Sequence, residues 1–244
     1  MWANNETGVV FPIETIATIV RDAGALFHTD AVQAAGKLPI DLRSLPIDLL
    51  SLSGHKLHAP KGIGVLYLRK GIHFAPFIMG GHQEQGRRAG TENVPYIIGL
   101  GSACELSLNG MEKENTRVAQ LRDRLEQELL DRCIDASVNG DRCHRLPNTT
   151  NISFKYIEGE SILLMLSEAG IAASSGSACT SGSLEPSHVL RAMGVPFTRV
   201  HGSVRFSLSR YTTDAHIDHI VQQMVDIEKR LRALSPFGRD ELNA

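Results

Sequence analysis

The chain has 244 residues, of which 42% are hydrophobic and 21% are charged, and its formal net charge is −2. Charges of both signs are interspersed, which argues against a nucleic-acid or membrane surface, and the apolar runs fall short of the roughly 18 residues of a membrane-spanning helix. The N-terminal MWANNETG has neither the basic nor the apolar region of a secretory signal, so we expect a cytoplasmic protein.

Helix-like and strand-like segments alternate over the first 111 residues. A helix that ends at Gly24 is predicted by apolar residues at helical spacing: Ile13, Ile16, Ala17 and Val20. Three short apolar runs are typical of buried strands: 25–33, 47–53 and 62–70. This order predicts an α/β fold in which helices cover a mainly parallel sheet and ligands bind beyond the carboxyl ends of the strands.

The pattern changes after residue 111. Residues 112–132 predict a long charged helix with one apolar stripe: Val118, Leu121, Leu125 and Leu129. Alternating apolar residues predict half-buried strands in 150–157 and 203–209, and a last helix begins near Thr213 and Asp214. We therefore divide the chain into part of a large domain, residues 1–111, and a smaller C-terminal α+β domain, residues 112–244.

A carboxylate and an amine follow two successive predicted strands. Asp30 ends the stretch ALFHTD of the first run, Gln33 lies on the same turn, and Lys56 follows the second run, flanked by Ser53 and His55. Such a pair suits pyridoxal phosphate (PLP), because a lysine amine joins its aldehyde and an aspartate keeps its pyridinium nitrogen protonated. Ser53 and His55 are candidate donors to the phosphate. On spacing alone, an ordinary turn aspartate and a solvated lysine are the better explanation, because both residue types are common at strand ends.

Four cysteines are present, with no CxxC pair. Cys179 lies in the run SSGSACTSGS, which offers little to bury it and predicts an accessible nucleophile, although an incidental loop cysteine remains an alternative. Cys104 and Cys133 lie in apolar helical patterns, which predicts core packing. Cys143 and His144 lack a second ligand pair, so no structural zinc is predicted.

Two further segments have anion-binding chemistry. Arg205 alternates with the apolar residues of its strand and has the planar guanidinium that binds a carboxylate, although on this pattern alone a surface ion pair is the better explanation. The glycine-rich run GGHQEQGRRAGTENVP, residues 80–95, suits an anion-binding turn or an exposed loop.

Taken together, these segments resemble the cysteine desulfurases of the PLP-dependent class V aminotransferase superfamily, nearest the nitrogen-fixation (NifS-like) type. The matching segments run in family order from end to end: NNETG, HTDAVQAAGKLPIDL, LSLSGHKLHAPKGIGVLYLRKG, GGHQEQGRRAGTENVP, SSGSACTSGSLEPSHVLRAMG and VRFSLSRYTT. The resemblance implies PLP-transferase fold type I and sulfur removal from L-cysteine, which yields L-alanine and a persulfide for iron–sulfur cluster assembly.

The resemblance also implies a role for each matching residue. Lys56 matches the Schiff-base lysine and general base, Asp30 the pyridinium partner, and Gln33 the residue bonded to the ring hydroxyl. Ser53 and His55 match phosphate ligands, and Thr91 a phosphate contact from the other subunit of a homodimer. Asn5 matches an asparagine near cofactor and substrate, Cys179 the persulfide-forming cysteine, and Arg205 the arginine that binds the substrate carboxylate.

Members of this family carry a long segment before NNETG, with a phosphate-gripping loop and a histidine that stacks on the ring. We therefore expect this chain to be the C-terminal part of such an enzyme, with little PLP uptake of its own. The expected sulfur acceptor is an iron–sulfur scaffold protein, and the closeness of the resemblance to the NifS-like type implies assembly of nitrogenase clusters. No resident metal is expected, with Cys179 as a candidate transient iron–sulfur ligand.

Three alternatives use the same residues. A selenocysteine lyase shares the fold and the cofactor. A non-catalytic remnant keeps only the surface that binds a scaffold partner. A small metal or iron–sulfur carrier uses Cys179 with Cys143 or His144.

Overall fold

The computed structural model describes residues 1–175 and 185–236. The fold is α/β, as predicted, and it divides into two compact units. Unit 1 comprises Met1–Ala3 and Phe11–Met111, and unit 2 comprises Asn4–Val10 and the residues from Glu112 onward. The segment Asn4–Val10 therefore packs with the C-terminal unit, although the sequence analysis grouped it with residues 1–111.

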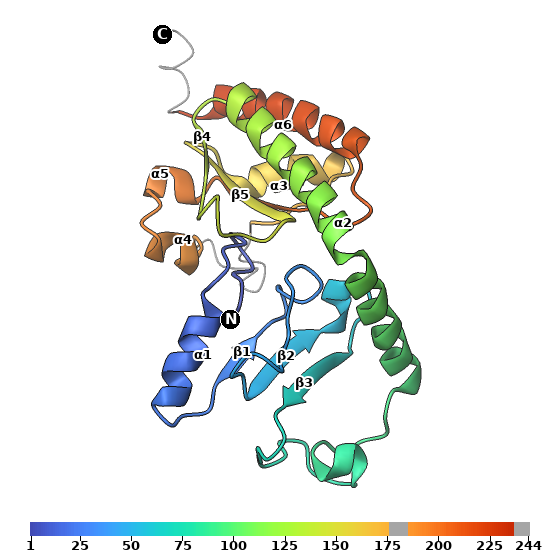
Figure 1. Cartoon of the computed structure of the whole chain (residues 1–244). Coiled ribbons are helices and arrows are strands. Elements are labelled where there is room, and N and C mark those ends of the chain that lie inside the picture. The colour runs from blue at the N-terminus through green and yellow to red at the C-terminus, as the bar shows by residue number, and fades with distance from the viewer. Residues whose placement is uncertain (176–184, 237–244) are drawn as a thin grey trace. The chain divides into compact units, whose positions relative to one another are not determined.

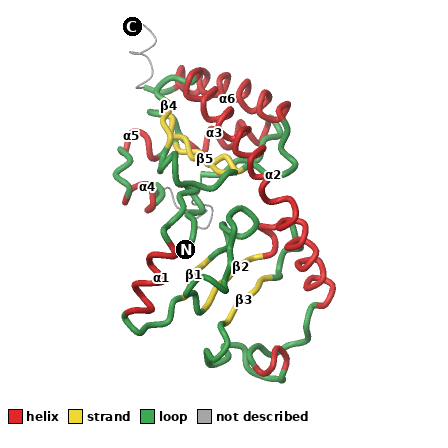
Figure 2. The backbone as a smooth tube through the Cα atoms, in the orientation of Figure 1, coloured by secondary structure: helices red, strands yellow, loops and turns green. Residues whose placement is uncertain are grey.

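Unit 1 contains a three-stranded sheet in the order β1-β2-β3 (Figures 1 and 2). Its elements are α1 (Ile13–Asp22), β1 (His28–Asp30), β2 (Leu49–Ser53), the 3-10 helix η1 (Gly54–Leu57), β3 (Gly64–Leu68), the 3-10 helix η2 (Gln83–Gly86) and the first part of α2 (Val94–Arg132). Ile13 and Ala17 of α1 are buried, and Gly24 follows the helix in a left-handed conformation, which confirms the predicted first helix and its end.

The sheet of unit 1 is mixed, whereas the sequence predicted a mainly parallel one. Strands β1 and β2 are parallel, with Asp30 opposite Ser51. Strands β2 and β3 are antiparallel, with Ser53 opposite Gly64. The connection between β2 and β3 contains only η1 and a turn, and such a link is too short for the crossover that parallel neighbours require.

Unit 2 contains a second, fully antiparallel sheet in the order β4-β5-β6. Its elements are the rest of α2, β4 (Ala136–Val138), β5 (Thr149–Phe154), α3 (Gly159–Glu168), α4 (His188–Ala192), α5 (Phe197–Val200), β6 (Ser203–Ser207) and α6 (Asp214–Leu234). The predicted start of the last helix is confirmed, because Thr213 caps α6 and forms a reciprocal capping box with His216.

One face of this second sheet carries the main hydrophobic core. Helices α2, α3 and α6 cover it (Figure 1). The predicted α2 stripe of Val118, Leu121, Leu125 and Leu129 is fully part of this core, together with Ile152, Phe154, Val204 and Phe206. Burial of these side chains supplies the main stabilisation of the unit, at about 1.5–3 kcal/mol for each large residue.

The opposite face of the same sheet is polar and is also buried. Asn151 and Ser153 of β5 point to this face, and all six residues of β5 are buried, so the prediction of a half-buried strand was wrong for β5. Segment 4–10 covers it: Asn151 donates a hydrogen bond of 3.1 Å from Nδ2 to the carbonyl of Glu6. Asn139 donates from Nδ2 to the Oδ1 of Asn151 at 2.7 Å and to the Oγ of Ser153 at 2.6 Å.

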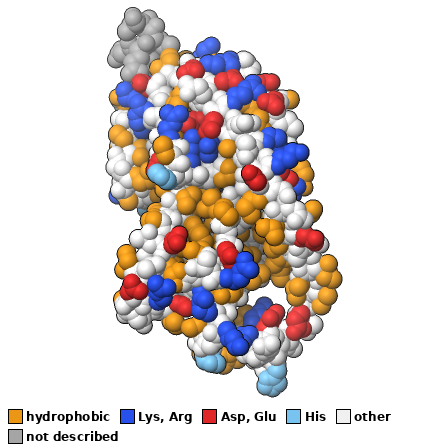
Figure 3. Space-filling model, viewed as in Figure 1, with side chains coloured by type: hydrophobic (Ala, Val, Ile, Leu, Met, Phe, Trp, Pro, Cys, Tyr) orange, Lys and Arg blue, Asp and Glu red, His pale blue; other side chains and the backbone are white. Residues whose placement is uncertain are grey.

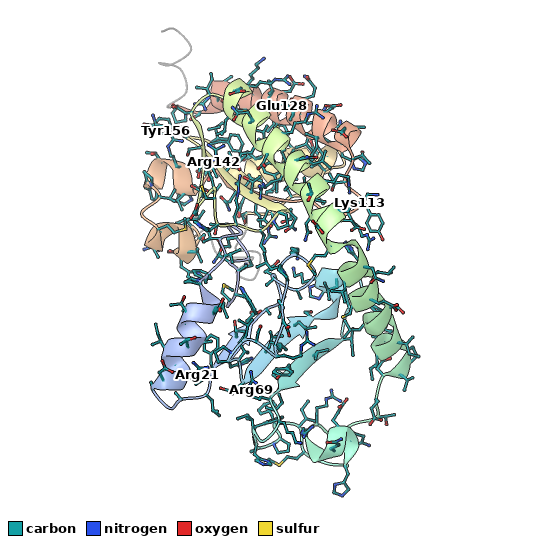
Figure 4. All side chains as sticks on the ribbon, viewed as in Figure 1. Arg21, Arg69, Lys113, Glu128, Arg142 and Tyr156 are labelled. Atoms are coloured by element: carbon teal, nitrogen blue, oxygen red, sulfur yellow. The ribbon has the colours of Figure 1, made fainter. Side chains whose placement is uncertain are left out.

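A buried charge network joins α2 to the segment before β5. The carboxylate of Glu126 accepts hydrogen bonds from Arg145 at 2.5 and 3.0 Å and from the hydroxyl of Thr150 at 2.6 Å. Arg142, labelled in Figure 4, lies 3.0 Å from the same carboxylate. The network therefore secures residues 142–150 against the helix.

The cysteine predictions had different outcomes. Cys133 is buried in the core of unit 2, as predicted. Cys104 is exposed, which corrects the prediction that it packs in a core, because α2 turns its neighbour Ala103 inward instead. Burial raises the pKa of the Cys133 thiol to about 12, with the Glu228 carboxylate adding to the effect, so this cysteine is held as a thiol.

Helices in the described ranges, 1–175 and 185–236, are all too short or too polar to cross a membrane. Basic and acidic side chains are interspersed on the visible face of α2 and α6 (Figure 3).

Candidate functional site

The parallel pair β1 and β2 gathers several predicted site residues at one edge of the unit 1 sheet. Asp30 is the last residue of β1, and the amide of the following Ala31 donates to the carbonyl of Ser51 at 2.8 Å. Ser53 is the last residue of β2, and Lys56 follows within η1. Because both strands end at the same edge, the carboxylate and the amine lie on the side of the sheet where α/β proteins bind ligands.

Two buried residues, Gly54 and Leu57, anchor the turn that carries Lys56. Leu57 packs in a small cluster with Ala35, Leu100 and Ala103. Gly54 is buried, and a Cβ there would lie 2.7 Å from a methyl carbon of Ile63, so only glycine fits this close approach. His55 and Lys56, between these anchors, are exposed. Packing therefore fixes the backbone of this tight turn, while the side chain of Lys56 stays accessible to a ligand.

Hydrogen bonds orient the polar groups around this edge. The Oγ of Ser53 and the Nδ1 of His55 are 2.8 Å apart, so the two predicted phosphate ligands contact one another. The Nε2 of His28 lies 2.8 Å from the Oγ of Ser51. The Oδ1 of Asp30 accepts a bond of 2.8 Å from the amide of Val32, which leaves its other oxygen for a ligand.

A second lysine lies beside this edge. Half-buried Lys37 donates from Nζ to the carbonyl of Gln33 at 3.1 Å. Burial lowers the pKa of Lys37 to about 8, and the positive charge of Lys56 adds to the effect. Lys37 was not among the predicted site residues, although its spacing of four residues from Gln33 was the available signal.

The glycine-rich run 80–95 contains η2 and two residues, Glu84 and Gln85, with left-handed backbone conformations. Thr91 is exposed, between Gly90 and the start of α2. An exposed Thr91 is accessible to a partner subunit, and its role as a cross-subunit phosphate contact stays a prediction.

Unit 2 brings together two of its predicted site residues, Asn5 and Arg205. The Nη1 of Arg205 donates to the main-chain carbonyl of Asn5 at 2.7 Å. Arg205 also forms an antiparallel bridge with Ser174, where its amide donates to the Ser174 carbonyl at 2.6 Å. The predicted orientation is confirmed, because Val204 and Phe206 point into the core while half-buried Arg205 points to the polar face.

The predicted nucleophile Cys179 lies outside the described residues. The described residues on either side of it in the sequence include Ser174 and Ser187. The hydroxyl of Ser187 donates a buried hydrogen bond of 2.6 Å to the carboxylate of Glu6. Glu6 was not among the predicted site residues, because a single acidic residue in NNETG carries no local signal of a partner that lies 181 residues away.

The Cys143 and His144 pair belongs to a surface turn. The Oδ2 of Asp141 lies 2.9 Å from the Nδ1 of His144, and its Oδ1 accepts from the amide of Cys143 at 2.7 Å. Among the described residues, no three histidine, cysteine, aspartate or glutamate side chains gather closely enough to hold a metal ion.

Comparison with known proteins finds relatives that match nearly the whole chain. The chain is 64% identical over 241 residues to a cysteine desulfurase of Nostoc sp. (strain PCC 7120), which covers 99% of this chain and 60% of the relative. It is 63% identical over 237 residues to the cysteine desulfurase NifS of Azotobacter vinelandii, covering 97% of this chain and 59% of the relative. The chain thus spans about 60% of the length of these curated relatives.

Solved structures show the same fold. A NifS-like protein superposes with a TM-score of 0.87 at 37% identity, covering 95% of this chain and 60% of that one. A NifS-like protein from Rickettsia africae superposes with a TM-score of 0.85 at 32% identity, covering 93% and 60%. The model of the aminotransferase class-V family matches residues 1–220. The chain belongs to the aminotransferase class-V family.

Proposed function

We propose that this chain is part of a PLP-dependent cysteine desulfurase, which takes sulfur from L-cysteine and releases L-alanine. The observation that carries the proposal is the placement of Lys56 and Asp30 at the ends of adjacent parallel strands. Its support from sequence is an identity of 63–65% to cysteine desulfurases from several bacteria.

The residues at the edge of the unit 1 sheet fit PLP. The cofactor needs a primary amine for its aldehyde, a carboxylate for its ring nitrogen and hydrogen-bond donors for its phosphate. Lys56 supplies the amine on an exposed turn, Asp30 has one carboxylate oxygen available beside the bond from Val32, and Ser53 and His55 supply a hydroxyl and an imidazole. Gln33 supplies an amide for the ring hydroxyl.

PLP, when bound, supplies an aldehyde that joins amines and a ring that accepts an electron pair from the substrate α-carbon. Lys56 would hold the cofactor through its amine, and the same amine would take the proton from the α-carbon of the substrate. Asp30 holds a proton at the ring nitrogen. Arg205 binds the substrate carboxylate, Asn5 lies beside cofactor and substrate, and this binding orients the substrate.

Cys179 receives the sulfur. Its thiolate attacks the sulfur atom of L-cysteine, so that a sulfur–sulfur bond forms while the bond between that sulfur and Cβ breaks. The electron pair of the broken bond stays with the carbon and is protonated, which yields L-alanine. The persulfide on Cys179 then passes its outer sulfur to an acceptor thiol.

The proposed partners follow from the same chemistry. The acceptor is an iron–sulfur scaffold protein, with nitrogenase cluster assembly suggested by the likeness to NifS of Azotobacter vinelandii. The proposed assembly is a cytoplasmic homodimer in which Thr91 contacts the phosphate bound by the other subunit.

The test uses the full-length protein that the gene encodes, incubated with PLP, L-cysteine and a thiol reductant that releases sulfide from the persulfide. We expect L-alanine and sulfide in equal amounts, with L-cysteine processed faster than L-selenocysteine. Production of neither would overturn the proposal, and a marked preference for L-selenocysteine would assign the protein to selenocysteine lyases instead.

A further inference from the structure

Two contacts of segment 4–10 with the rest of unit 2 concern the chain on either side of Cys179. Asn5 is bonded to Arg205, whose strand bridges Ser174, and Glu6 is bonded to Ser187. Ser174 precedes Cys179 by five residues and Ser187 follows it by eight. Consecutive residues of one segment therefore secure the described chain on both sides of the predicted nucleophile.

The Glu6 contact is short and shielded from solvent. The Ser187 hydroxyl donates to the Oε2 of Glu6 at 2.6 Å, and the two residues are only 6% and 3% exposed. A hydrogen bond to a charged group contributes about 1.5–3 kcal/mol, more than a neutral one. Removal of either side chain would leave the other one buried without this hydrogen bond.

The same hydroxyl also caps a helix. The Oγ of Ser187 accepts from the amides of Val189 and Leu190, at 3.1 and 3.2 Å. Since the Ser187 proton points to Glu6, the oxygen lone pairs are directed to α4, and Glu6 sets the orientation of this cap. The carboxylate thus determines where the chain enters α4.

Glu6 is itself held by its main chain. Its amide donates to the Oδ1 of Asn4 at 2.9 Å, and its carbonyl accepts from Asn151 at 3.1 Å. A side chain fixed at both its backbone and its carboxylate is a rigid support, which is what a reacting group on an adjoining segment requires.

We propose that Glu6 is a positioning residue for sulfur transfer, which acts through Ser187 on the segment that carries Cys179. The inference rests on the proposed function, because it needs Cys179 to be the sulfur acceptor. Glu6 does not contact the reacting atoms in this scheme.

The experiment measures single-turnover persulfide formation on Cys179 in the PLP-loaded protein, together with PLP content and the Kd for L-cysteine from spectral titration. Glu6→Ala lowers the rate by about 10- to 100-fold, the equivalent of one charged hydrogen bond, and leaves PLP content and Kd unchanged. Glu6→Gln keeps an acceptor oxygen and recovers most of the rate. Ser187→Thr keeps the hydroxyl and also recovers most of the rate, whereas Ser187→Ala does not recover it.

Glu6 and Ser187 act as one hydrogen-bonded pair. The double variant, Glu6→Ala with Ser187→Ala, should therefore form the persulfide no more slowly than the slower single variant. The matched control is Glu160→Ala, which removes an exposed carboxylate in the first turn of α3 of the same unit and should leave the rate within about twofold.

Three results overturn the inference: an unchanged rate in Glu6→Ala, additive losses in the double variant, or a lower rate that only follows a loss of bound PLP. Failure of the proposed function is distinct, because the unaltered protein would then form no persulfide on Cys179 at all.

Discussion

Arg205 donates a hydrogen bond of 2.7 Å to the carbonyl of Asn5, a residue 200 positions earlier in the chain. Arg205 is also the direct cross-strand partner of Asn151, which bonds the next carbonyl along, that of Glu6. Two neighbouring strand residues thus hold two consecutive peptide groups. This contact fixes the orientation of the Arg205 guanidinium.

Substitution of this arginine tests its role in substrate binding. Arg205→Lys keeps the positive charge but loses the planar pair of donors, so we expect KM for L-cysteine to rise by about 10- to 100-fold. The content of bound PLP should stay unchanged, because Arg205 is assigned to the substrate. Arg191→Lys, at an exposed position, is the control. An unchanged KM in steady-state assays would remove Arg205 from the substrate site.

Lys56 is expected to be the amine that holds PLP. Lys56→Ala should abolish both the visible absorbance of lysine-bound PLP and all sulfide production, because no other residue is assigned to take the α-proton. Lys70→Ala, at an exposed lysine in the turn after β3, should retain both. An unchanged spectrum in the Lys56 variant, recorded after removal of unbound PLP, would contradict the assignment.

Cys179 should be needed for sulfur transfer and not for cofactor binding. Cys179→Ser is expected to bind PLP and L-cysteine with unchanged spectra but to release no sulfide, because a hydroxyl does not form a persulfide. Cys143→Ser is the matched control, since Cys143 is an exposed cysteine of the same unit. Sulfide release by the Cys179 variant at the rate of the control would refute the role.

Lys37 should make stability depend on pH. Burial and the charge of Lys56 lower its pKa from 10.5 to about 8 in the folded chain. Between these values the unfolded chain keeps a proton that the folded chain has lost, so the free energy of unfolding rises with pH through this window. Lys37→Met removes this rise and should stabilise the neutral-pH protein by at most on the order of 3 kcal/mol.

Urea denaturation of the cofactor-free protein at several pH values from 7 to 10 measures this effect. Lys70→Met, at the exposed lysine, should keep the pH dependence of the unaltered protein. Parallel stability curves for the Lys37 variant and the unaltered protein would show that Lys37 keeps an ordinary pKa.

The buried Glu126 network should carry a large share of the stability of unit 2. Burial alone would raise the pKa of Glu126, but hydrogen bonds from Arg145 and Thr150 together with nearby arginine charge lower it overall. Arg145→Ala leaves this carboxylate buried without its main partner, and the expected loss at neutral pH is about 3–5 kcal/mol.

The loss should shrink as the pH falls, because the folded-state contribution of a carboxyl with a lowered pKa disappears through that pKa. Arg43→Ala, which breaks the exposed pair with Asp41, should change stability little. Equal effects of the two substitutions in denaturant titrations would contradict the role of the buried network.

Local patterns in the sequence determined much of the fold. The stripe from Val118 to Leu129 predicted the core face of α2, and Thr213 predicted the start of α6, because periodicity and capping depend on neighbours within a few residues. The positions of Asp30 and Lys56 after strands β1 and β2 were predicted in the same way, since strand ends are visible in the local pattern.

Tertiary structure alone decided the rest. Burial of both faces of β5 and the exposure of Cys104 depend on which distant segments meet. The Glu6 to Ser187 bond and the lowered pKa of Lys37 are further cases. Burial and long-range hydrogen bonds arise from contacts between segments up to 200 residues apart, and local periodicity carries no record of them.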